Sequence, residues 1–206
     1  MKNIDLSLYL VTDKSEDIEK FLKTIEESIK GGVSIVQIRE KTAETLDFYN
    51  LALKVKKITT KYNVPLIIND RIDVALAIDA DGVHVGQNDI PCDVTRKLIG
   101  KDKILGVSAS TISEAKKAQE DGADYIGTGA VFPTATKDDA PSITKQDLKK
   151  IVDAIDIPVV AIGGINHENA SELIETGISG LSVVSAIMNA ENPKKASEEL
   201  LNVFNA

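Results

Sequence analysis

Two carboxylates, Asp70 and Asp89, each follow a short apolar segment, and the two segments are neighbours along the chain. Carboxylate oxygens suit a hard cation, and Mg²⁺ in particular takes one or two carboxylates and completes its shell with water and phosphate oxygens. The alternative is that each carboxylate caps the helix that follows it, near Arg71 and at Pro91. Taken singly, either residue fits a cap; taken together, beside nearby cations, they predict a magnesium site that serves a phosphorylated ligand.

The segment 37–41 carries three hydrogen-bond donors at alternating positions. In an extended chain, alternate side chains point the same way, so Gln37, Arg39 and Lys41 are expected to face one volume. Two of the three are cations, which suits a polyanion. The alternative is a set of exposed rim charges paired with Glu40 and Glu44, an arrangement that is common and weak.

A glycine pair at Gly163–Gly164 follows one apolar segment, and Ser185 follows the next. Many barrels bind a phosphate at the seventh and eighth turns with backbone N–H groups and a helix N-terminus. Glycine favours this because no Cβ obstructs the anion. Tight glycine turns also end buried strands for steric reasons, which is the alternative.

The glycine-bracketed segment 127–137 ends in two hydroxyls and a cation, Thr134, Thr136 and Lys137. We interpret it as a flap that grips phosphate, against the alternative of an ordinary surface excursion. His84 and His167 are more than 80 residues apart and are interpreted as structural. Neither Cys92 nor any serine has an evident base beside it, so covalent hydrolase chemistry is not indicated.

Short apolar segments alternate with helical patterns along the whole chain, and this alternation would position these side chains. Eight segments have the β-branched, apolar character of buried strands: 6–11, 34–38, 66–68, 82–85, 104–107, 125–127, 159–162 and 181–184. One-sided apolar stripes at 18–29 and 148–155 predict helices, and Thr111 with Glu114 forms a capping box pattern.

Strict β-then-α alternation implies parallel strands with right-handed crossovers. Eight units in 206 residues, about 26 per unit, predict one closed (β/α)8 TIM barrel over residues 1–206. The alternative, an open doubly wound sheet, lacks its Gly-x-Gly-x-x-Gly turn after the first strand, where Thr12–Ser15 stands. The carboxyl ends of the strands should then gather the polar residues on one rim.

The composition excludes several classes of protein. Lys and Arg number 24 against 32 Asp and Glu, for a net charge of −8, so a basic nucleic-acid surface is not expected. No apolar run reaches the ~20 residues that span a bilayer, and the start does not resemble a signal peptide. With one cysteine there is no internal disulfide. We therefore expect a cytoplasmic protein with no nucleic-acid or membrane partner.

Six segments in order resemble one known family. They are Gln37-Ile-Arg-Glu-Lys41, Ile68-Asn-Asp-Arg71, Gly82-Val-His-Val-Gly-Gln87, Gly106-Val-Ser108, Phe132-Pro-Thr-Ala-Thr-Lys137 and Ala161-Ile-Gly-Gly-Ile165. Over essentially its full length, the chain resembles the thiamine-phosphate synthase (thiamine-phosphate pyrophosphorylase) family. That family joins a hydroxymethylpyrimidine diphosphate to a thiazole phosphate and releases pyrophosphate. The sequence departs from the family at Ala130, usually proline, and at Ser142-Ile143, commonly Gly-Leu.

The resemblance implies roles for individual residues, one Mg²⁺ per subunit on Asp70 and Asp89, and a homodimer. It implies that the pyrimidine diphosphate is held by Gln37, Ile38, Arg39, Glu40, Lys41, Asn69, Ser108 and Lys137, with catalytic roles for Arg39, Lys41, Ser108 and Lys137. It implies that the thiazole phosphate is held by Thr134, Ala135, Thr136, Gly164, Val184 and Ser185. The implied mechanism is dissociative, and a departing diphosphate needs charge neutralisation more than a strong base.

Two other functions remain as alternatives. A thiazole tautomerase is a related barrel that handles the thiazole phosphate alone, and it would not need Asp70, Asp89, Arg39 and Lys41, all of which are present. A non-catalytic sensor of phosphorylated ligands is the second alternative, and turnover would separate it from an enzyme.

Overall fold

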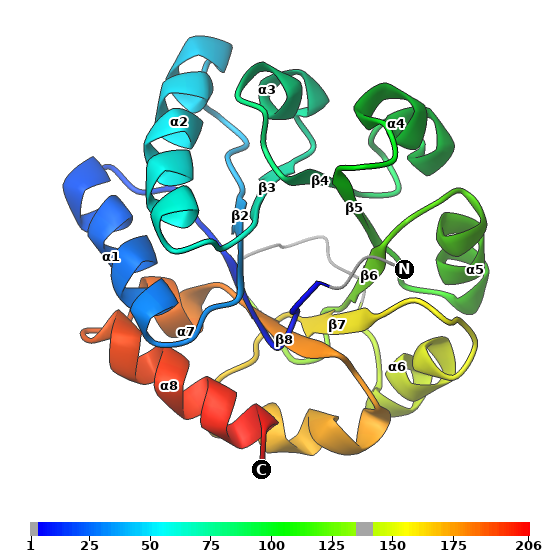
Figure 1. The fold of residues 1–206 in the computed structure, drawn as a ribbon. Helices are drawn as coiled ribbons and strands as arrows, with labels where there is room; N and C mark the ends of the chain where they lie inside the picture. Colours follow the sequence, from blue (N-terminus) through cyan, green and yellow to red (C-terminus); the bar gives the residue numbers. More distant parts are fainter. Residues whose placement is uncertain (1–3, 135–141) are drawn as a thin grey trace.

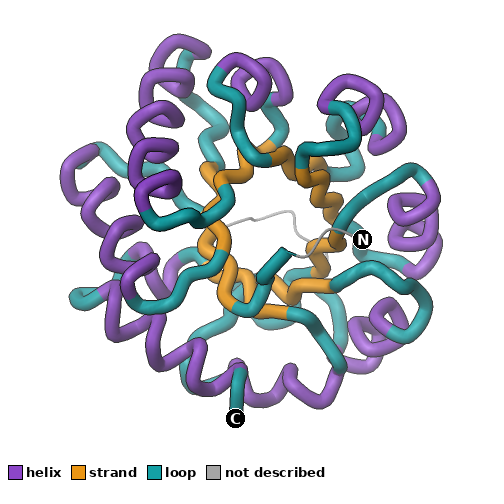
Figure 2. Tube along the Cα trace, in the orientation of Figure 1, coloured by secondary structure: helices purple, strands orange, loops and turns teal. Residues whose placement is uncertain are grey.

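A computed structural model of the chain describes residues 4–134 and 142–206, and it forms a ring of eight strands inside a ring of helices (Figures 1 and 2). The strands are β1 (Leu8–Val11), β2 (Ile35–Ile38), β3 (Leu66–Asn69), β4 (Gly82–Val85), β5 (Ile104–Ser108), β6 (Tyr125–Thr128), β7 (Val159–Ile162) and β8 (Gly180–Val183). Each agrees with a predicted strand to within two residues.

Helices follow the strands and cover the outside of the sheet, as Figure 1 shows. They are α1 (Ile18–Lys30), α2 (Thr45–Lys61), α3 (Ile72–Ala77), α4 (Cys92–Ile99), α5 (Ile112–Glu120), α6 (Lys145–Val152), the 3₁₀ helix η1 (Ala170–Thr176), α7 (Ser185–Met188) and α8 (Pro193–Phe204). The capping box at Thr111 and Glu114 is confirmed at the start of α5. The helix predicted from the 148–155 stripe ends earlier than expected, because α6 stops at Val152, six residues before Pro158.

The sheet is a closed parallel barrel in which every strand pairs with its neighbours in sequence and β8 pairs with β1. Leu8 lies opposite Leu181 across this closing pair. The predicted (β/α)8 TIM barrel is therefore confirmed, and the open sheet is excluded. Parallel strands place all their carboxyl ends at one end of the barrel, which is where such barrels hold ligands.

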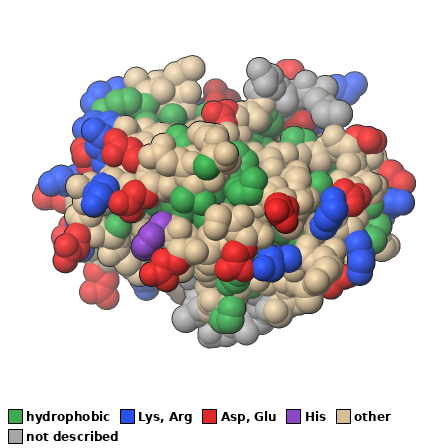
Figure 3. Space-filling model, turned by 90° about the horizontal axis from the view of Figure 1, so that it is seen from below, with side chains coloured by type: hydrophobic (Ala, Val, Ile, Leu, Met, Phe, Trp, Pro, Cys, Tyr) green, Lys and Arg blue, Asp and Glu red, His purple; other side chains and the backbone are tan. Residues whose placement is uncertain are grey.

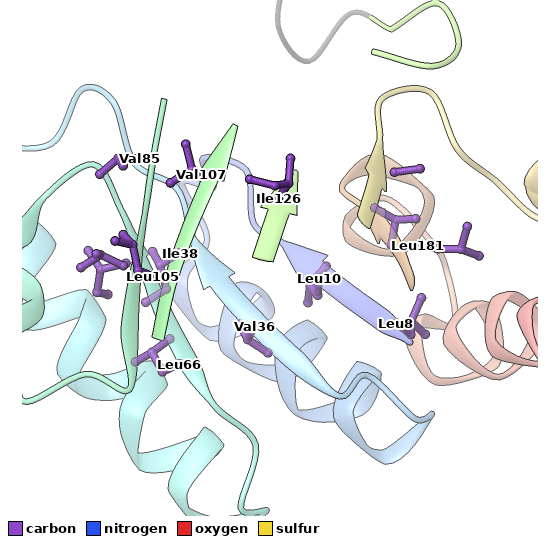
Figure 4. Packing of buried hydrophobic residues seen from close by; sticks show 14 of the residues in the cluster. Leu8, Leu10, Val36, Ile38, Leu66, Val85, Leu105, Val107, Ile126 and Leu181 are labelled. Carbon is purple, nitrogen blue, oxygen red and sulfur yellow. The ribbon is translucent and has the colours of Figure 1, made fainter. Parts of the chain in front are cut away.

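Side chains alternate between two cores on either side of the strands. Leu8, Leu10, Val36 and Ile38 point outward and pack against the helices (Figure 4). Their inward neighbours, such as Tyr9, form a second, smaller cluster inside the barrel, which also contains Leu6, Val11, Ile35, Ile67, Ile104, Tyr125 and Val160. This period of two lets one short strand serve both cores. It also places the inward polar residues in the barrel mouth.

The amino-terminal end of the barrel is tied together by charged side chains. Arg96 of α4 donates to the carbonyls of Gly100, Lys103 and Gly122 and to the Asp124 carboxylate, over 2.7–3.0 Å. Asp124 in turn accepts from Leu105 N at 2.8 Å, so one ion pair connects the segments that enter β5 and β6. In such barrels this end contributes stability, while the opposite end carries the chemistry.

The surface carries charges of both signs. On the face drawn in Figure 3, Lys and Arg side chains are interspersed with Asp and Glu, and they do not gather into one basic area. Within the described residues, no helix has the length and apolar character required to cross a bilayer.

Candidate active site

A cavity of about 170 Å³ opens at the carboxyl ends of the strands. One water needs only ~15 Å³, so the space is large enough for an organic ligand. Eight of the predicted site residues line it: Gln37, Arg39, Asn69, Ser108, Thr134, Gly164, Val184 and Ser185. The prediction that strand ends from both halves of the chain meet around one volume is confirmed by this placement.

Asp70 and Asp89 lie next to each other at the edge of this mouth. They follow β3 and β4, which pair in parallel. The Asp70 backbone is held by a hydrogen bond from its N–H to the His84 carbonyl at 2.9 Å, and its carboxylate pairs with the Lys41 ammonium. The Asp89 carboxylate accepts from Gly86 N at 2.7 Å, which turns it back toward β4.

Neither carboxylate caps the helix that follows it. The residue before α3 is Arg71 and the residue before α4 is Pro91, and neither helix start has a side-chain cap. The capping alternative is therefore wrong for both residues. Asp70 has a φ of +60°, a left-handed conformation that aspartate tolerates better than most residues.

The electrostatics of the pair fit a cation. Burial raises the pKa of the Asp70 carboxyl, the adjacent Asp89 carboxylate raises it further, and the Lys41 ammonium opposes both. Two carboxylates that disfavour each other's charge are stabilised by a shared positive ion. Across the described residues, no third His, Cys, Asp or Glu joins them to make a closed metal cage. The donor set therefore fits Mg²⁺, which accepts two carboxylates and takes its other oxygens from water and phosphate.

One of the three alternating donors of the 37–41 segment differs from the expectation. Gln37 and Arg39 line the cavity, but Lys41 lies outside its lining and contacts Asp70 at the edge. The physical reason is that β2 ends at Ile38, after which the period of two no longer holds. The Ile38 side chain packs in the outer core, and the Glu40 carboxylate accepts from Thr42 N at 2.7 Å within its own loop. Neither side chain lines the cavity.

The glycine turn after β7 is shaped by its contact with the segment that follows β6. Gly163 and Gly164 have φ values of +101° and +66°, which L side chains rarely adopt. A Cβ at Gly164 would lie 2.5 Å from the Pro133 carbonyl oxygen and 2.8 Å from Phe132 Cβ. The glycines therefore allow the 130–134 segment to lie against the mouth, a steric reason that acts alongside the predicted access for an anion.

The two departures from the family pattern contact each other. Ile143 N donates to the Ala130 carbonyl at 2.9 Å, and both residues are buried. Val131 N also donates to the Ile162 carbonyl at 3.1 Å, which fixes the near end of the segment to β7. Of the predicted flap residues, Thr134 lines the cavity, whereas Ala135, Thr136 and Lys137 lie outside the described residues.

Sequence reasoning missed a buried polar chain below the cavity. Tyr9, Tyr125 and His84 point inward from β1, β6 and β4, and hydrogen bonds join them to Gln37 and Ser108. His84 was interpreted as structural, yet it lines the cavity as well as being buried. The available signal was the inward phase of each strand, since Tyr9 and His84 each lie between two outward core residues and Tyr125 directly precedes the outward Ile126.

Comparison with known proteins agrees with this geometry. The family model for thiamine monophosphate synthase matches residues 8–187. The thiamine-phosphate synthase of Methanobrevibacter smithii is 73% identical over 206 residues, covering 100% of this chain and 99% of that protein. The thiamine-phosphate synthase of Clostridium tetani is 55% identical over 208 residues, covering 99% of this chain and 98% of that protein.

A solved structure gives the same result. The thiamine phosphate pyrophosphorylase from Pyrococcus furiosus has a TM-score of 0.87 and 41% identity, covering 98% of this chain and 96% of that one. These matches favour the synthase over the tautomerase and the sensor, and they agree with a mouth that combines an acidic pair, cations and a glycine turn. The chain belongs to the thiamine monophosphate synthase family and is a transferase of thiamine biosynthesis.

Proposed function

We propose that the cavity holds both substrates at once, the pyrimidine diphosphate beside β2, β3 and β5 and the thiazole phosphate beside β7 and β8. The observation that carries this proposal is the arrangement of the mouth. Gln37, Asn69 and Ser108 line one side of it, while Gly164 and Ser185 line the side formed by the last two strands. Two anionic ligands held in this way place their reacting ends toward each other.

The reaction breaks the C–O bond between the pyrimidine methylene and the diphosphate, and the electron pair leaves with the diphosphate oxygen. The thiazole nitrogen then gives its lone pair to the methylene carbon, which forms the new C–N bond. No proton is removed from carbon in this exchange. The site therefore needs groups that stabilise developing negative charge, and it does not need a strong base.

Arg39 and Lys41 are the described cations placed to meet that charge. Arg39 lines the cavity, and Lys41 lies at its edge on Asp70. Lys137 is proposed to join them, as the family resemblance implies. A Mg²⁺ held by Asp70 and Asp89 supplies Lewis-acid stabilisation of the diphosphate when bound. Ser108, at the end of β5, adds a hydroxyl beside this group.

The remaining assigned residues bind and orient the substrates. Ile38 and Glu40 are proposed to contribute through the backbone of the segment after β2, because their side chains are engaged elsewhere. On the other side, Gly164 and the start of α7 at Val184 and Ser185 are proposed to hold the thiazole phosphate. The segment Thr134, Ala135 and Thr136 is proposed to complete this phosphate site.

Other features support proposals about the domain organisation, the cellular location and the oligomeric state of the enzyme. We propose that residues 1–206 act as one barrel domain, supported by the closed pairing of β1 with β8. A cytoplasmic location is supported by the single free cysteine. A homodimer is supported by the family resemblance and by exposed apolar side chains on the neighbouring helices α3 and α4, Leu76, Val94 and Leu98.

A pyrophosphate-release assay with both substrates tests the metal assignment. Asp70→Asn and Asp89→Asn should each lower the rate by roughly a hundredfold or more, because metal stabilisation of a leaving group is worth several kcal/mol. EDTA should abolish release by the unaltered enzyme, and added Mg²⁺ should restore it.

Asp93→Asn is the matched control. Asp93 lies four residues beyond Asp89, but it pairs with Lys97 on the outside of α4, so its removal should leave the rate unchanged. Near-normal pyrophosphate release by both Asp70→Asn and Asp89→Asn would contradict the metal assignment. Absence of release by the unaltered enzyme with both substrates and Mg²⁺ would contradict the function itself.

A further inference from the structure

A continuous chain of hydrogen bonds crosses the barrel below the cavity and joins Gln37 to Ser108. Gln37 Nε2 donates to the Tyr9 hydroxyl over 2.7 Å, and the Tyr9 and Tyr125 hydroxyls lie 2.6 Å apart. The Tyr125 hydroxyl lies 3.0 Å from His84 Nδ1, and His84 Nε2 lies 2.9 Å from Ser108 Oγ. The four residues that lead to Ser108 are each 8% exposed or less, so these contacts are shielded from bulk water.

The chemistry of one end sets the direction of the whole chain. An amide nitrogen can only donate, so the Tyr9 hydroxyl accepts from Gln37. The order that gives each buried proton an acceptor then has Tyr9 donating to the Tyr125 oxygen and Tyr125 donating to His84 Nδ1, which in this order is the unprotonated nitrogen of the ring. Burial raises the pKa of both phenols above its usual value, so each keeps the one proton that this order requires.

We propose that Gln37, Tyr9 and Tyr125 are positioning residues that hold His84 in its Nε2–H tautomer. His84 then donates to Ser108 Oγ, and Ser108 turns its own hydroxyl proton toward the bound diphosphate. At the other end, the Gln37 nitrogen is engaged by Tyr9, which leaves its carbonyl oxygen to accept from an amino group on the pyrimidine. The catalytic consequence rests on the proposed function, in which Ser108 meets the diphosphate.

The backbone of β5 provides room for this chain. Gly106 lies opposite His84 in β4 and opposite Tyr125 in β6. A Cβ at position 106 would lie 2.1 Å from Tyr125 Cζ and 2.5 Å from His84 Nδ1. Glycine weakens a strand interior, and in strands it often marks a close approach by another group. Here it leaves open the gap that the Tyr125–His84 hydrogen bond crosses.

The tautomer is measured directly in the free protein by long-range ¹H–¹⁵N correlation of the histidine rings. The chain has two histidines, so a His167→Gln variant assigns the remaining signal to His84. We expect His84 to carry its proton on Nε2, with Nδ1 unprotonated. A proton on Nδ1 in the unaltered protein would overturn the proposal, whatever the activity.

A Gln37→Glu variant tests the direction from the far end of the chain. An ionised carboxylate only accepts, so at a pH high enough to ionise this buried carboxyl, Tyr9, Tyr125 and His84 should each reverse and the His84 proton should move to Nδ1. A merely structural histidine, three hydrogen bonds away, would keep its tautomer. An unchanged Nε2–H tautomer in folded Gln37→Glu protein would count against the proposal.

Kinetic measurements distinguish a positioning role of the Tyr125 hydroxyl from a role of the Tyr125 ring in packing. Tyr125→Phe keeps the ring, which packs 5.8 Å from Tyr9 and 5.6 Å from His84 between ring centres, and removes only the hydroxyl. We expect kcat to fall about tenfold, the effect of one misdirected hydrogen bond, while KM for the thiazole phosphate stays within about twofold.

Tyr62→Phe is the matched control, because the Tyr62 hydroxyl donates to Glu26 on the outer helices and should leave kcat unchanged. An unchanged kcat in Tyr125→Phe would overturn the role in catalysis. If the unaltered protein releases no pyrophosphate but His84 shows the expected tautomer and reversal, the proposed function fails and the hydrogen-bond order stands.

Discussion

Lys41 pairs with Asp70 at the edge of the mouth, and its side chain is 51% exposed. An ammonium has three donors and no acceptor, so one contact with a carboxylate leaves it able to meet a second anion. Lys41 can thus hold Asp70 in place and also contact an incoming diphosphate. An arginine would be a poor substitute, because its planar fork favours two parallel contacts with one partner.

Cys92 is the single thiol, and its environment makes it unreactive. It lies at the start of α4 with its Sγ 3.6 Å from the Ala118 carbonyl oxygen, and burial raises its pKa to about 11. We expect alkylation by iodoacetamide at pH 8 to be about a hundredfold slower in the folded protein than in urea, because the thiolate is the reacting form.

A surface thiol provides the comparison for this prediction. Lys97→Cys in a Cys92→Ser background places the thiol on the same helix, at a side chain that is 75% exposed, and it should react quickly. Equal rates for folded and unfolded Cys92 would contradict the prediction. The raised pKa also means that the unfolded chain ionises first, so this group lowers folding stability as the pH rises from 9.0 to about 11.

At the scale of residues, the sequence predicts site groups whose polar type stands out at or near the end of a strand, and it misses aromatic groups within a strand. Asp70, Asp89 and Ser108 stand at strand ends, where residue type and position are both informative. Tyr9 and Tyr125 lie within strands beside apolar residues, and an aromatic ring at such a position is interpreted as part of the hydrophobic core. Only the closed barrel shows that their hydroxyls meet 2.6 Å apart.

Among the elements, α4 is joined by Arg96 to the segments that enter β5 and β6. Its side chain is 16% exposed, and its guanidinium bonds three carbonyls and the Asp124 carboxylate. Arg96→Ala should lower the free energy of unfolding by about 2–3 kcal/mol, the cost of removing a charged donor from several acceptors. Urea unfolding measures this change, and the pyrophosphate-release rate under native conditions should not change, because Arg96 lies at the end of the barrel away from the mouth.

Lys97→Ala is the control for Arg96 on the same helix. The Lys97 side chain is exposed and pairs with Asp93, so its loss should cost less than about 0.5 kcal/mol. A similar loss of stability in both variants would show that α4 is sensitive to any change of charge. That result would contradict a specific role of the Arg96 guanidinium in stability.

The turn after β7 gives a prediction about the segment that it supports. Gly164→Ala should push Phe132 and Pro133 away from the mouth, since the new Cβ would lie 2.5 Å from the Pro133 oxygen. Affinity for the thiazole phosphate, measured by titration calorimetry, should fall at least about tenfold, which corresponds to 1.4 kcal/mol.

Gly177→Ala is a close control for this turn. Gly177 has a similar φ of +80°, but a Cβ there would meet only Val152 Cγ1 at 3.4 Å, an ordinary contact. Gly177→Ala should therefore introduce similar backbone strain and leave the affinity for the thiazole phosphate unchanged. Equal losses of affinity in the two variants would mean that strain alone is responsible.

Element boundaries were predictable where local chemistry sets them. Apolar β-branched segments located all eight strands, and Thr111 with Glu114 located the start of α5. The end of β2 at Ile38 was not marked by a glycine or proline, so the sequence did not show that Lys41 contacts Asp70 at the edge of the mouth, outside the cavity lining. The 130–134 segment depends on a contact with Gly164, which is distant in sequence and leaves no local pattern.

For the molecule as a whole, the number and order of the β–α units predict the barrel, and the barrel gathers the site. The family resemblance then agrees with the relatives at 73% and 55% identity. The architecture also separates the residues that stabilise the fold from those that carry the chemistry. Arg96 and Asp124 lie at one end of the strands, while Asp70 and Asp89 lie at the other. Variants that affect stability and variants that affect chemistry should therefore fall into largely separate groups.

The pairing of β1 with β8 has a consequence for how the protein is made. β1 is synthesised before the other strands of the barrel, and one of its two neighbours is β8, which is synthesised after them. Until β8 is formed, β1 has an edge of unpaired backbone N–H and C=O groups, which favours association with other nascent polypeptides. We therefore expect chains synthesised at high density to need chaperones, or rapid completion of each chain, to keep newly made copies apart.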